Sequence, residues 1–134
     1  MEKKAFIALG LVLLLNLPSA AFISRENMHI NAENLVQIVN YISKSVTITG
    51  TIQSSRLTNN SKVIFLNFGN NFNTSLSAVI YDFDVPAFID AGINDPENYF
   101  KNKKVVLNGI IRIDDGKPEI IVNSPKQIKI IEEE

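Results

Sequence analysis

Residues 44–52 read KSVTITGTI, and residues 103–111, which follow at a constant offset of 59 positions, read KKVVLNGII. Both stretches alternate between two sets of side chains with a period of two, which is typical of a strand that buries one face. Each carries a glycine at the same place, Gly50 in the first and Gly109 in the second. A glycine inside a strand allows a tight bend. The repeat therefore predicts two long strands that bend at these glycines and serve both sides of a small barrel.

The Asn108-Gly109 pair leaves a second interpretation open, because Asn-Gly is the strongest short-range signal for a two-residue hairpin. Under that interpretation, residues 103–113 form two short strands instead of one. The first copy favours a continuous strand, since threonines flank Gly50 and threonine is common in strands. The turn-forming sequence DDGKP at residues 114–118 then makes the hairpin of this region.

Hydrophobic periodicity along the chain predicts one helix followed by five strands. The helix covers residues 32–42 and has one apolar face, formed by Leu35, Ile38, Val39 and Ile42. The strands cover residues 46–53, 62–68, 75–81, 103–113 and 119–123. A helix-compatible segment, residues 86–91, lies between the third and fourth strands, and residues 127–131 alternate too weakly to classify. This order predicts an all-β domain with a minor helical part.

The composition excludes several classes of function. The chain has 134 residues, of which 46% are hydrophobic and 20% are charged, with a formal charge of −1 and no cysteine. This fits a single domain and excludes disulfides, thiol catalysis and cysteine-based metal sites. The one histidine, His29, cannot form a site that needs two imidazoles. We therefore expect a binding module that is not an enzyme and that holds no cofactor and no metal.

Residues 1–21, MEKKAFIALGLVLLLNLPSAA, have the layout of a secretory signal peptide. Two lysines precede an apolar run of 11 residues, which is shorter than the roughly 20 residues of a membrane span. We expect cleavage after Ala21, with an uncleaved anchor as the alternative, and a periplasmic or secreted protein. Cleavage removes Lys3, Lys4 and Glu2 from 13 basic and 14 acidic residues, which leaves 11 and 13 and a charge of −2. The expected parts are then an N-terminal segment with the helix (22–42), the barrel (43–131) and an acidic tail (132–134).

Five motifs carry a family resemblance: SKSVTITGTI (43–52), FLNFG (65–69), KVVLNGII (104–111), GKPEIIV (116–122) and SPKQI (124–128). Together they resemble the nucleic-acid-binding OB-fold domains of bacteria, of the anticodon-binding type. The group in question occurs in small exported proteins and beside secreted nuclease domains. The resemblance implies a five-stranded OB-fold Greek-key barrel behind the N-terminal helix, and single-stranded nucleic acid as the default ligand.

An OB-fold usually binds its ligand on the outer face of its second and third strands. Strand alternation assigns Ile64, Leu66 and Phe68, and likewise Leu76, Ala78 and Ile80, to the core. The outer face then carries Phe65, Asn67 and Tyr81. Base stacking requires exposed aromatic rings, so Phe65 and Tyr81 are the expected platforms. The alternative is that both rings cover the barrel surface or pack under residues 83–101.

Phosphate groups require arginine or lysine beside the stacking rings. Four basic residues could frame this face: Arg56 in the first loop, Lys62 at the start of the second strand, Arg112 late in the fourth strand, and Lys117 in the hairpin turn. Asp82 and Asp84 are expected to form a turn and a helix start and not a weak calcium site.

We therefore expect weak binding of single-stranded DNA or RNA, by stacking and a few phosphate contacts. The charge of −2, the threonines of residues 46–53 and the asparagine-rich segment 70–73 leave a second possibility open. That possibility is a module that binds an envelope protein or a glycan. A third is a non-catalytic accessory domain that acts beside a partner enzyme.

Overall fold

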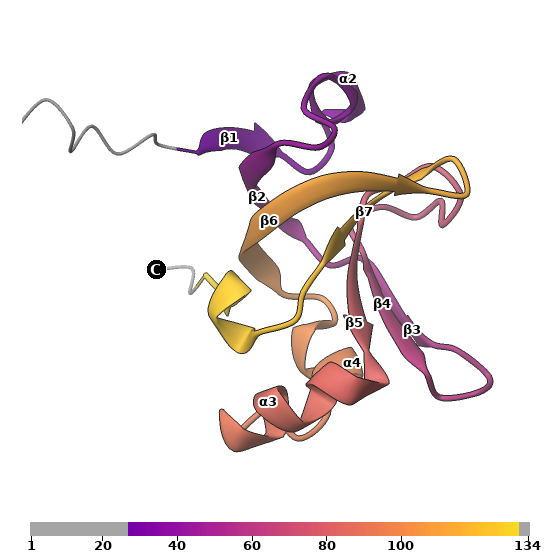
Figure 1. The fold of residues 1–134 in the computed structure, drawn as a ribbon, viewed down its shortest axis with the longest axis vertical. Coiled ribbons are helices and arrows are strands. Elements are labelled where there is room, and N and C mark those ends of the chain that lie inside the picture. Colours follow the sequence, from indigo (N-terminus) through magenta and orange to yellow (C-terminus); the bar gives the residue numbers. More distant parts are fainter. Residues whose placement is uncertain (1–26, 132–134) are drawn as a thin grey trace, which may run out of the picture.

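The computed structural model describes residues 27–131. The expected signal peptide (1–21), residues 22–26 and the acidic tail (132–134) lie outside the described residues. The fold is mostly β with few helices, as the sequence predicts. Its elements are, in order (Figure 1), β1 Met28–Asn31, α2 Leu35–Asn40, β2 Ser45–Thr51, β3 Ser54–Leu57, β4 Val63–Asn67, β5 Ser77–Tyr81, the 3-10 turn η2 Asp82–Asp84, α3 Val85–Asp90, α4 Pro96–Phe100, β6 Lys104–Asp114, β7 Lys117–Ile121, η3 Pro125–Gln127 and β8 Ile128–Ile130.

The strands form one coiled sheet in the order β1-β2-β6-β7-β5-β4-β3, with β8 also paired to β6. Although β2 and β3 stand far apart in this order, they are consecutive in the chain. The Ile52 N–H donates to the Lys103 carbonyl oxygen at 2.9 Å, and the Gln53 N–H donates to the Asn67 carbonyl oxygen at 2.8 Å. The chain thus changes its partner from β6 to β4 between two neighbouring residues. This step closes the sheet into a barrel and confirms the predicted strand that serves both sides.

β6 is one continuous strand of 11 residues, so the alternative hairpin at Asn108-Gly109 is wrong. Neither of these residues has the positive φ that such a turn requires. Instead, Asp115 (φ 49°) and Gly116 (φ 73°) form a two-residue turn between β6 and β7. The turn is shorter than the predicted five-residue turn, because β6 and β7 stay paired up to Asp114 and Lys117.

The two repeated glycines lie where parts of the structure approach closely. A Cβ added to Gly50 would lie 2.6 Å from the Cβ of Ala32 and 3.0 Å from Cδ1 of Phe68. At Gly109 an added Cβ would overlap the side chain of Ile120. β6 changes its partner from β2 to β7 two residues after Gly109. These positions therefore require glycine for space, at the places where the strands bend.

The barrel interior is filled by the residues that strand alternation assigns to it. Ile64, Leu66 and Phe68, and likewise Leu76, Ala78 and Ile80, are all buried, which confirms that assignment. α3 and α4 close one end of the barrel (Figure 1) and insert Phe88 and Phe100, whose rings meet edge to face with centroids 6.3 Å apart. α2 lies at the opposite end.

The N-terminal helix differs from its prediction. α2 has six residues, fewer than the predicted segment 32–42. Only Ile38 of its predicted apolar face is fully buried, while Leu35 and Val39 are 38% and 54% exposed. The apolar face stays largely exposed because only one residue of this short helix packs into the core. No helix within residues 27–131 is long and apolar enough to cross a membrane.

Candidate functional site

Phe65 lies on the outer face of β4, where it contacts two cations. Arg56 stands opposite Phe65 in the β3–β4 register, and its Cζ lies 4.8 Å from the ring centroid. The Nζ of Lys117 lies 5.0 Å from the same centroid. Both are cation–π contacts, in which the ring face attracts positive charge. The sequence prediction is corrected in two details, because Arg56 lies on β3 and not in a loop, and Lys117 begins β7.

The ammonium group of Lys117 is partly desolvated in this cluster, which disfavours its charged form. Burial lowers the pKa of Lys117, and the nearby Arg56 lowers it further, while Glu119 acts in the opposite direction. A cation in such surroundings gains from an anion that replaces its lost water. The cluster of Arg56, Phe65 and Lys117 is therefore suited to an aromatic or anionic ligand.

A second aromatic platform lies next to the first on β5. The rings of Tyr81 and Phe83 are stacked, with centroids 5.3 Å apart and an interplanar angle of 8°. Phe83 is 73% exposed, which is the highest exposure of any large aromatic side chain among the described residues. Sequence reasoning missed Phe83 because it belongs to the η2 turn and not to a strand. The outermost ring of this platform is therefore Phe83, and Tyr81 supports it from beneath.

Arg112 connects the second platform to a buried carboxylate. Its Nη2 donates to the Tyr81 hydroxyl at 2.9 Å and to Oε2 of Glu119 at 3.1 Å. Glu119 is only 3% exposed. Its burial raises its pKa, although the hydrogen bond from Arg112 opposes this shift. Burial also works to lower the pKa of Arg112, but its bonds with Tyr81 and Glu119 raise that pKa overall.

One donor on this face has no acceptor. The Nε of Arg112 is buried and has no hydrogen-bond partner among the described residues. Buried donors are normally satisfied, so this N–H is an exception on the face. The sequence does contain a signal for Glu119. In a hairpin whose two turn residues are Asp115 and Gly116, the strand register places Glu119 opposite Arg112.

Asn67 does not belong to the accessible site, and its predicted exposure is wrong. It lies on the outer side of β4 but is 0% exposed. Its Oδ1 accepts from the Ser77 hydroxyl at 2.6 Å, and its Nδ2 donates to the Ser54 hydroxyl at 3.4 Å. Strand alternation predicts the side to which a residue points but not how deeply its neighbours cover it. The amide of Asn67 therefore links β3, β4 and β5.

Lys62 also stands apart from the cluster around Phe65. Its Nζ forms an exposed ion pair with Oδ2 of Asp82 at 3.1 Å. Oδ1 of Asp82 accepts from the Phe83 N–H at 2.9 Å, so Asp82 shapes the turn that presents Phe83. Among residues 27–131, no three acidic or histidine side chains gather closely enough to hold a metal ion.

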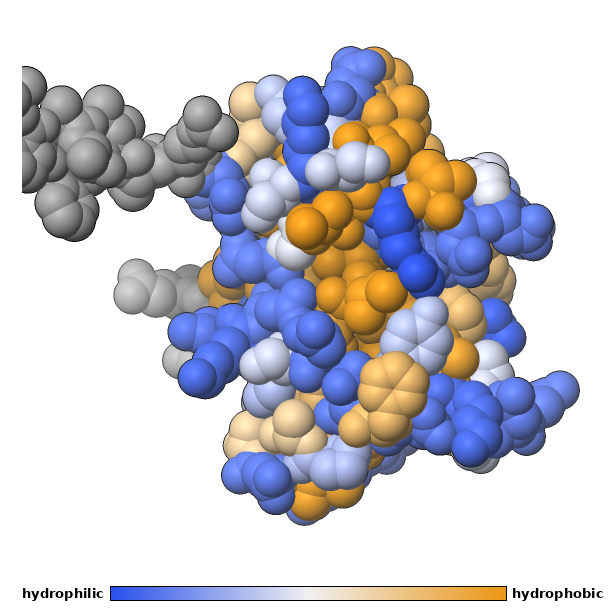
Figure 2. Space-filling model, in the orientation of Figure 1, coloured by the Kyte–Doolittle hydropathy of each residue, from blue (hydrophilic) through white to orange (hydrophobic). Residues whose placement is uncertain are grey.

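The surface around these residues is hollowed in two places. A cleft of about 390 Å³ lies between the β4–β5 loop and the β6–β7 turn, and Phe65, Phe72 and Asp114 are among its lining residues. An apolar groove of about 440 Å³ lies between β6 and β7, where Ile110 and Ile121 flank Arg112. Figure 2 shows this hydrophobic surface over β6 and β7 with hydrophilic side chains around it. Aromatic, apolar and basic groups thus share one side of the barrel.

No protein-family profile and no curated protein matches this chain. Several solved structures share its fold. A protein described as an aspartyl-tRNA synthetase from Leishmania major has a TM-score of 0.50 and 16% identity, over 84% of this chain and 22% of that one. Two OBodies bound to hen egg-white lysozyme have TM-scores of 0.52 and 0.51, each at 16% identity. They match 81% and 84% of this chain over 97% and 100% of their own.

The chain spans about a fifth of the synthetase and nearly the whole of each OBody. At 16% identity this likeness shows the fold alone. The fold is an OB-fold, which agrees with the family resemblance in the sequence and with the closure of the sheet through β2 and β3.

Proposed function

We propose that this protein binds single-stranded nucleic acid on the outer face of β4, β5 and β7. One observation carries the proposal: two aromatic platforms and three basic side chains meet on one sheet face. Phe65 has Arg56 and Lys117 above its ring, and the stacked pair of Tyr81 and Phe83 has Arg112 beside it. Stacking rings beside basic groups are the elements of sequence-tolerant single-strand binding.

Each residue of this face has a separate role in the proposed binding. A base stacks on the exposed ring of Phe83, with Tyr81 behind it. A second base stacks on the planar guanidinium of Arg56, which rests on Phe65. Phosphates contact Arg56 and Lys117, and Arg112, whose side chain is 37% exposed, adds positive charge beside them. Every base has a flat face, so this arrangement predicts little sequence preference.

Acidic groups on the same face limit the electrostatic part of binding. Glu119 neutralises Arg112, and Asp114 and Asp115 line the cleft beside Phe65. Two or three phosphate contacts then predict a salt slope of about −1.5 to −2 for a single strand. Affinity should fall by roughly tenfold between about 50 and 200 mM salt.

The test is fluorescence anisotropy with labelled single-stranded DNA and RNA of about 12 nucleotides, a length within the range that an OB-fold covers. A duplex of the same length serves as the matched probe. We expect both single strands to bind more tightly than the duplex and to show the shallow salt slope. No binding of either single strand at about 50 mM salt would overturn the proposed function.

A protein ligand is the second candidate, and the apolar groove between β6 and β7 favours it. Ile110, which lines this groove with Arg112 and Ile121, is 59% exposed, and Arg112 donates to the hydroxyl of Tyr81. Aromatic side chains and arginine at the centre of an apolar patch are typical of protein interfaces. The OBodies, whose fold is similar, are bound to lysozyme. Capture of a protein that the oligonucleotides do not displace would favour this candidate.

We further propose that the protein acts without catalysis outside the cytoplasm. The layout of residues 1–21 supports export. The lack of cysteine and the presence of a single histidine, His29, support a role without catalysis. Mass spectrometry of the protein from its native cells tests export. An N-terminus at Phe22 is expected, and a chain that retains residues 1–21 would contradict cleavage.

A further inference from the structure

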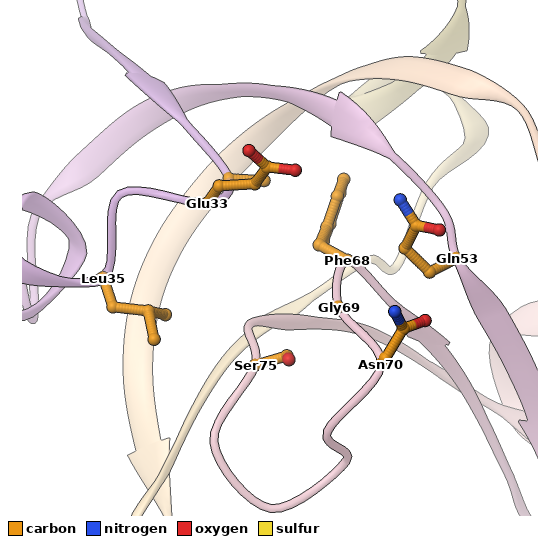
Figure 3. A pocket seen from close by; sticks show the side chains of 8 residues that line it. Glu33, Leu35, Gln53, Phe68, Gly69, Asn70 and Ser75 are labelled. Carbon is orange, nitrogen blue, oxygen red and sulfur yellow. The ribbon is translucent and has the colours of Figure 1, made fainter.

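A further cavity, of about 280 Å³, lies at the end of the barrel near α2, and none of the cations around Phe65 lines it. Glu33 reaches it from the β1–α2 connection, Gln53 from the β2–β3 junction, and Asn70 and Ser75 from the β4–β5 loop. Figure 3 shows the polar ends of Glu33, Gln53 and Asn70 arranged around the ring of Phe68. Three separate parts of the chain therefore bring polar side chains to one opening.

The floor of this cavity is fixed by the fold. Phe68 and Ala32 are 3% exposed each, and both press on the backbone of Gly50. A side chain at residue 50 would displace them, since an added Cβ would lie 2.6 Å from the Cβ of Ala32. The loop above is also tight, because a Cβ at Gly69 would overlap Ser75. The apolar floor and the polar rim are consequently held at a set spacing.

The charge of the rim has one sign. Among the residues that the structure describes, Glu33 is the only charged one that lines the cavity, and no lysine or arginine of this part lines it. Within residues 27–131, the side chains of Glu33, Gln53 and Asn70 have no hydrogen-bond partner, although the Glu33 backbone N–H donates to Asn31. Their carboxylate and amide oxygens are therefore open to a donor. An anionic ligand is disfavoured here, and a cation with an apolar stem is favoured.

We propose that this cavity binds a primary alkylammonium group. The ammonium has three N–H donors and no acceptor, which matches the acceptor oxygens of Glu33, Gln53 and Asn70. Its aliphatic stem lies against Phe68 and Leu35, since such stems bury readily on apolar surface. A lysine side chain of a partner protein and a free diamine share this chemistry. The site is separate from the nucleic-acid face, and the proposal does not depend on that face.

The experiment is a titration of the ¹⁵N-labelled protein with n-butylammonium, followed in the amide NMR spectrum. n-Butanol is the neutral probe of the same shape. Glu33→Gln removes the charge, and Glu97→Gln, on α4 at the other end of the barrel, is the matched control. We expect saturable shifts at Glu33, Gln53, Gly69 and Ser75 in the wild type and in Glu97→Gln.

Butanol and the Glu33→Gln variant should each show at least tenfold weaker binding. Two further probes, a capped Gly-Lys-Gly peptide and 1,4-diaminobutane, distinguish a lysine side chain from a free diamine as the source of the amine. Tighter binding of either probe supports the proposal. Equal binding of butanol and butylammonium would overturn it. Shifts that map to the cleft beside Phe65, or no saturable shift at all, would overturn it as well.

Discussion

The outer face of β2 and the outer face of β4 belong to the same bent sheet, but they carry different chemistry. On β2 the outward residues are threonines, and the Thr47 hydroxyl donates to Oδ1 of Asn108 on β6 at 2.6 Å. On β4 the outward Phe65 holds Arg56 and Lys117 over its ring. Both faces satisfy the strand alternation equally well, so the fold does not require the difference. It indicates that the β4 face, and not the β2 face, is built for a ligand.

Removal of both aromatic platforms is the strongest test of this difference. Phe65→Ala combined with Phe83→Ala should weaken binding of a single-stranded oligonucleotide by at least about 30-fold, since stacking contributes about 1–3 kcal/mol per base. Thr47→Ala combined with Thr49→Ala, on the β2 face, should leave the affinity within about twofold. Fluorescence anisotropy measures both. Equal losses on the two faces would remove the distinction between them.

The bend that separates the two faces depends on Gly50. Gly50→Ala should lower the free energy of unfolding by about 1–3 kcal/mol, because the new methyl group overpacks Ala32 and Phe68. Urea unfolding measures this change. Thr49→Ala is the neighbouring control, which adds no atom to the core. A Gly50→Ala protein as stable as the wild type would show that this close approach is not required.

Arg56 tests the electrostatic part of the β4 face. Arg56→Gln should reduce the magnitude of the salt slope by about 0.7–1, which corresponds to one lost phosphate contact. Lys62→Gln should leave the slope nearly unchanged, because Lys62 already pairs with Asp82. The slopes come from anisotropy titrations at several salt concentrations. A larger effect of Lys62 than of Arg56 would contradict the placement of the site.

Glu119 gives the smallest expected effect, on the pH dependence of stability. Its burial raises its pKa in the folded state, so above the ordinary glutamic acid pKa of about 4.3 the folded state holds more protons than the unfolded state. The contribution of Glu119 to stability is therefore full below that pH and is lost as the pH rises through the raised pKa. Glu119→Gln should flatten this part of the profile. Parallel urea-unfolding profiles for the two proteins would contradict the assignment.

The sequence predicts most of the barrel because local patterns encode it. Alternation in residues 62–68 and 75–81 identifies the core, and the glycine repeat identifies the bends. β1, β3 and β8 are not predicted because they are only three or four residues long, and β1 and β8 also pair with strands that are distant in the sequence. β3 (SSRL) in particular has no apolar alternation and exists as a strand because β4 pairs with it.

The site is predictable only in part, for reasons that are physical. Alternation places Phe65 and Tyr81 outward, and it places Asn67 outward too, but burial of Asn67 depends on Ser54 and Ser77 from two other strands. Phe83 becomes a platform through the geometry of the η2 turn, which periodicity does not describe. Depth of cover and turn geometry are properties of the assembled barrel.

The central claim is that single-stranded nucleic acid binds on the β4 face and not on the β2 face. The most direct measurement is an amide NMR titration of the protein with a single-stranded oligonucleotide of about 12 nucleotides. The account predicts shifts at Arg56, Phe65, Phe83, Arg112 and Lys117, with the amides of Thr47 and Thr49 unmoved. Shifts centred on β2, or spread evenly over the barrel, would contradict it.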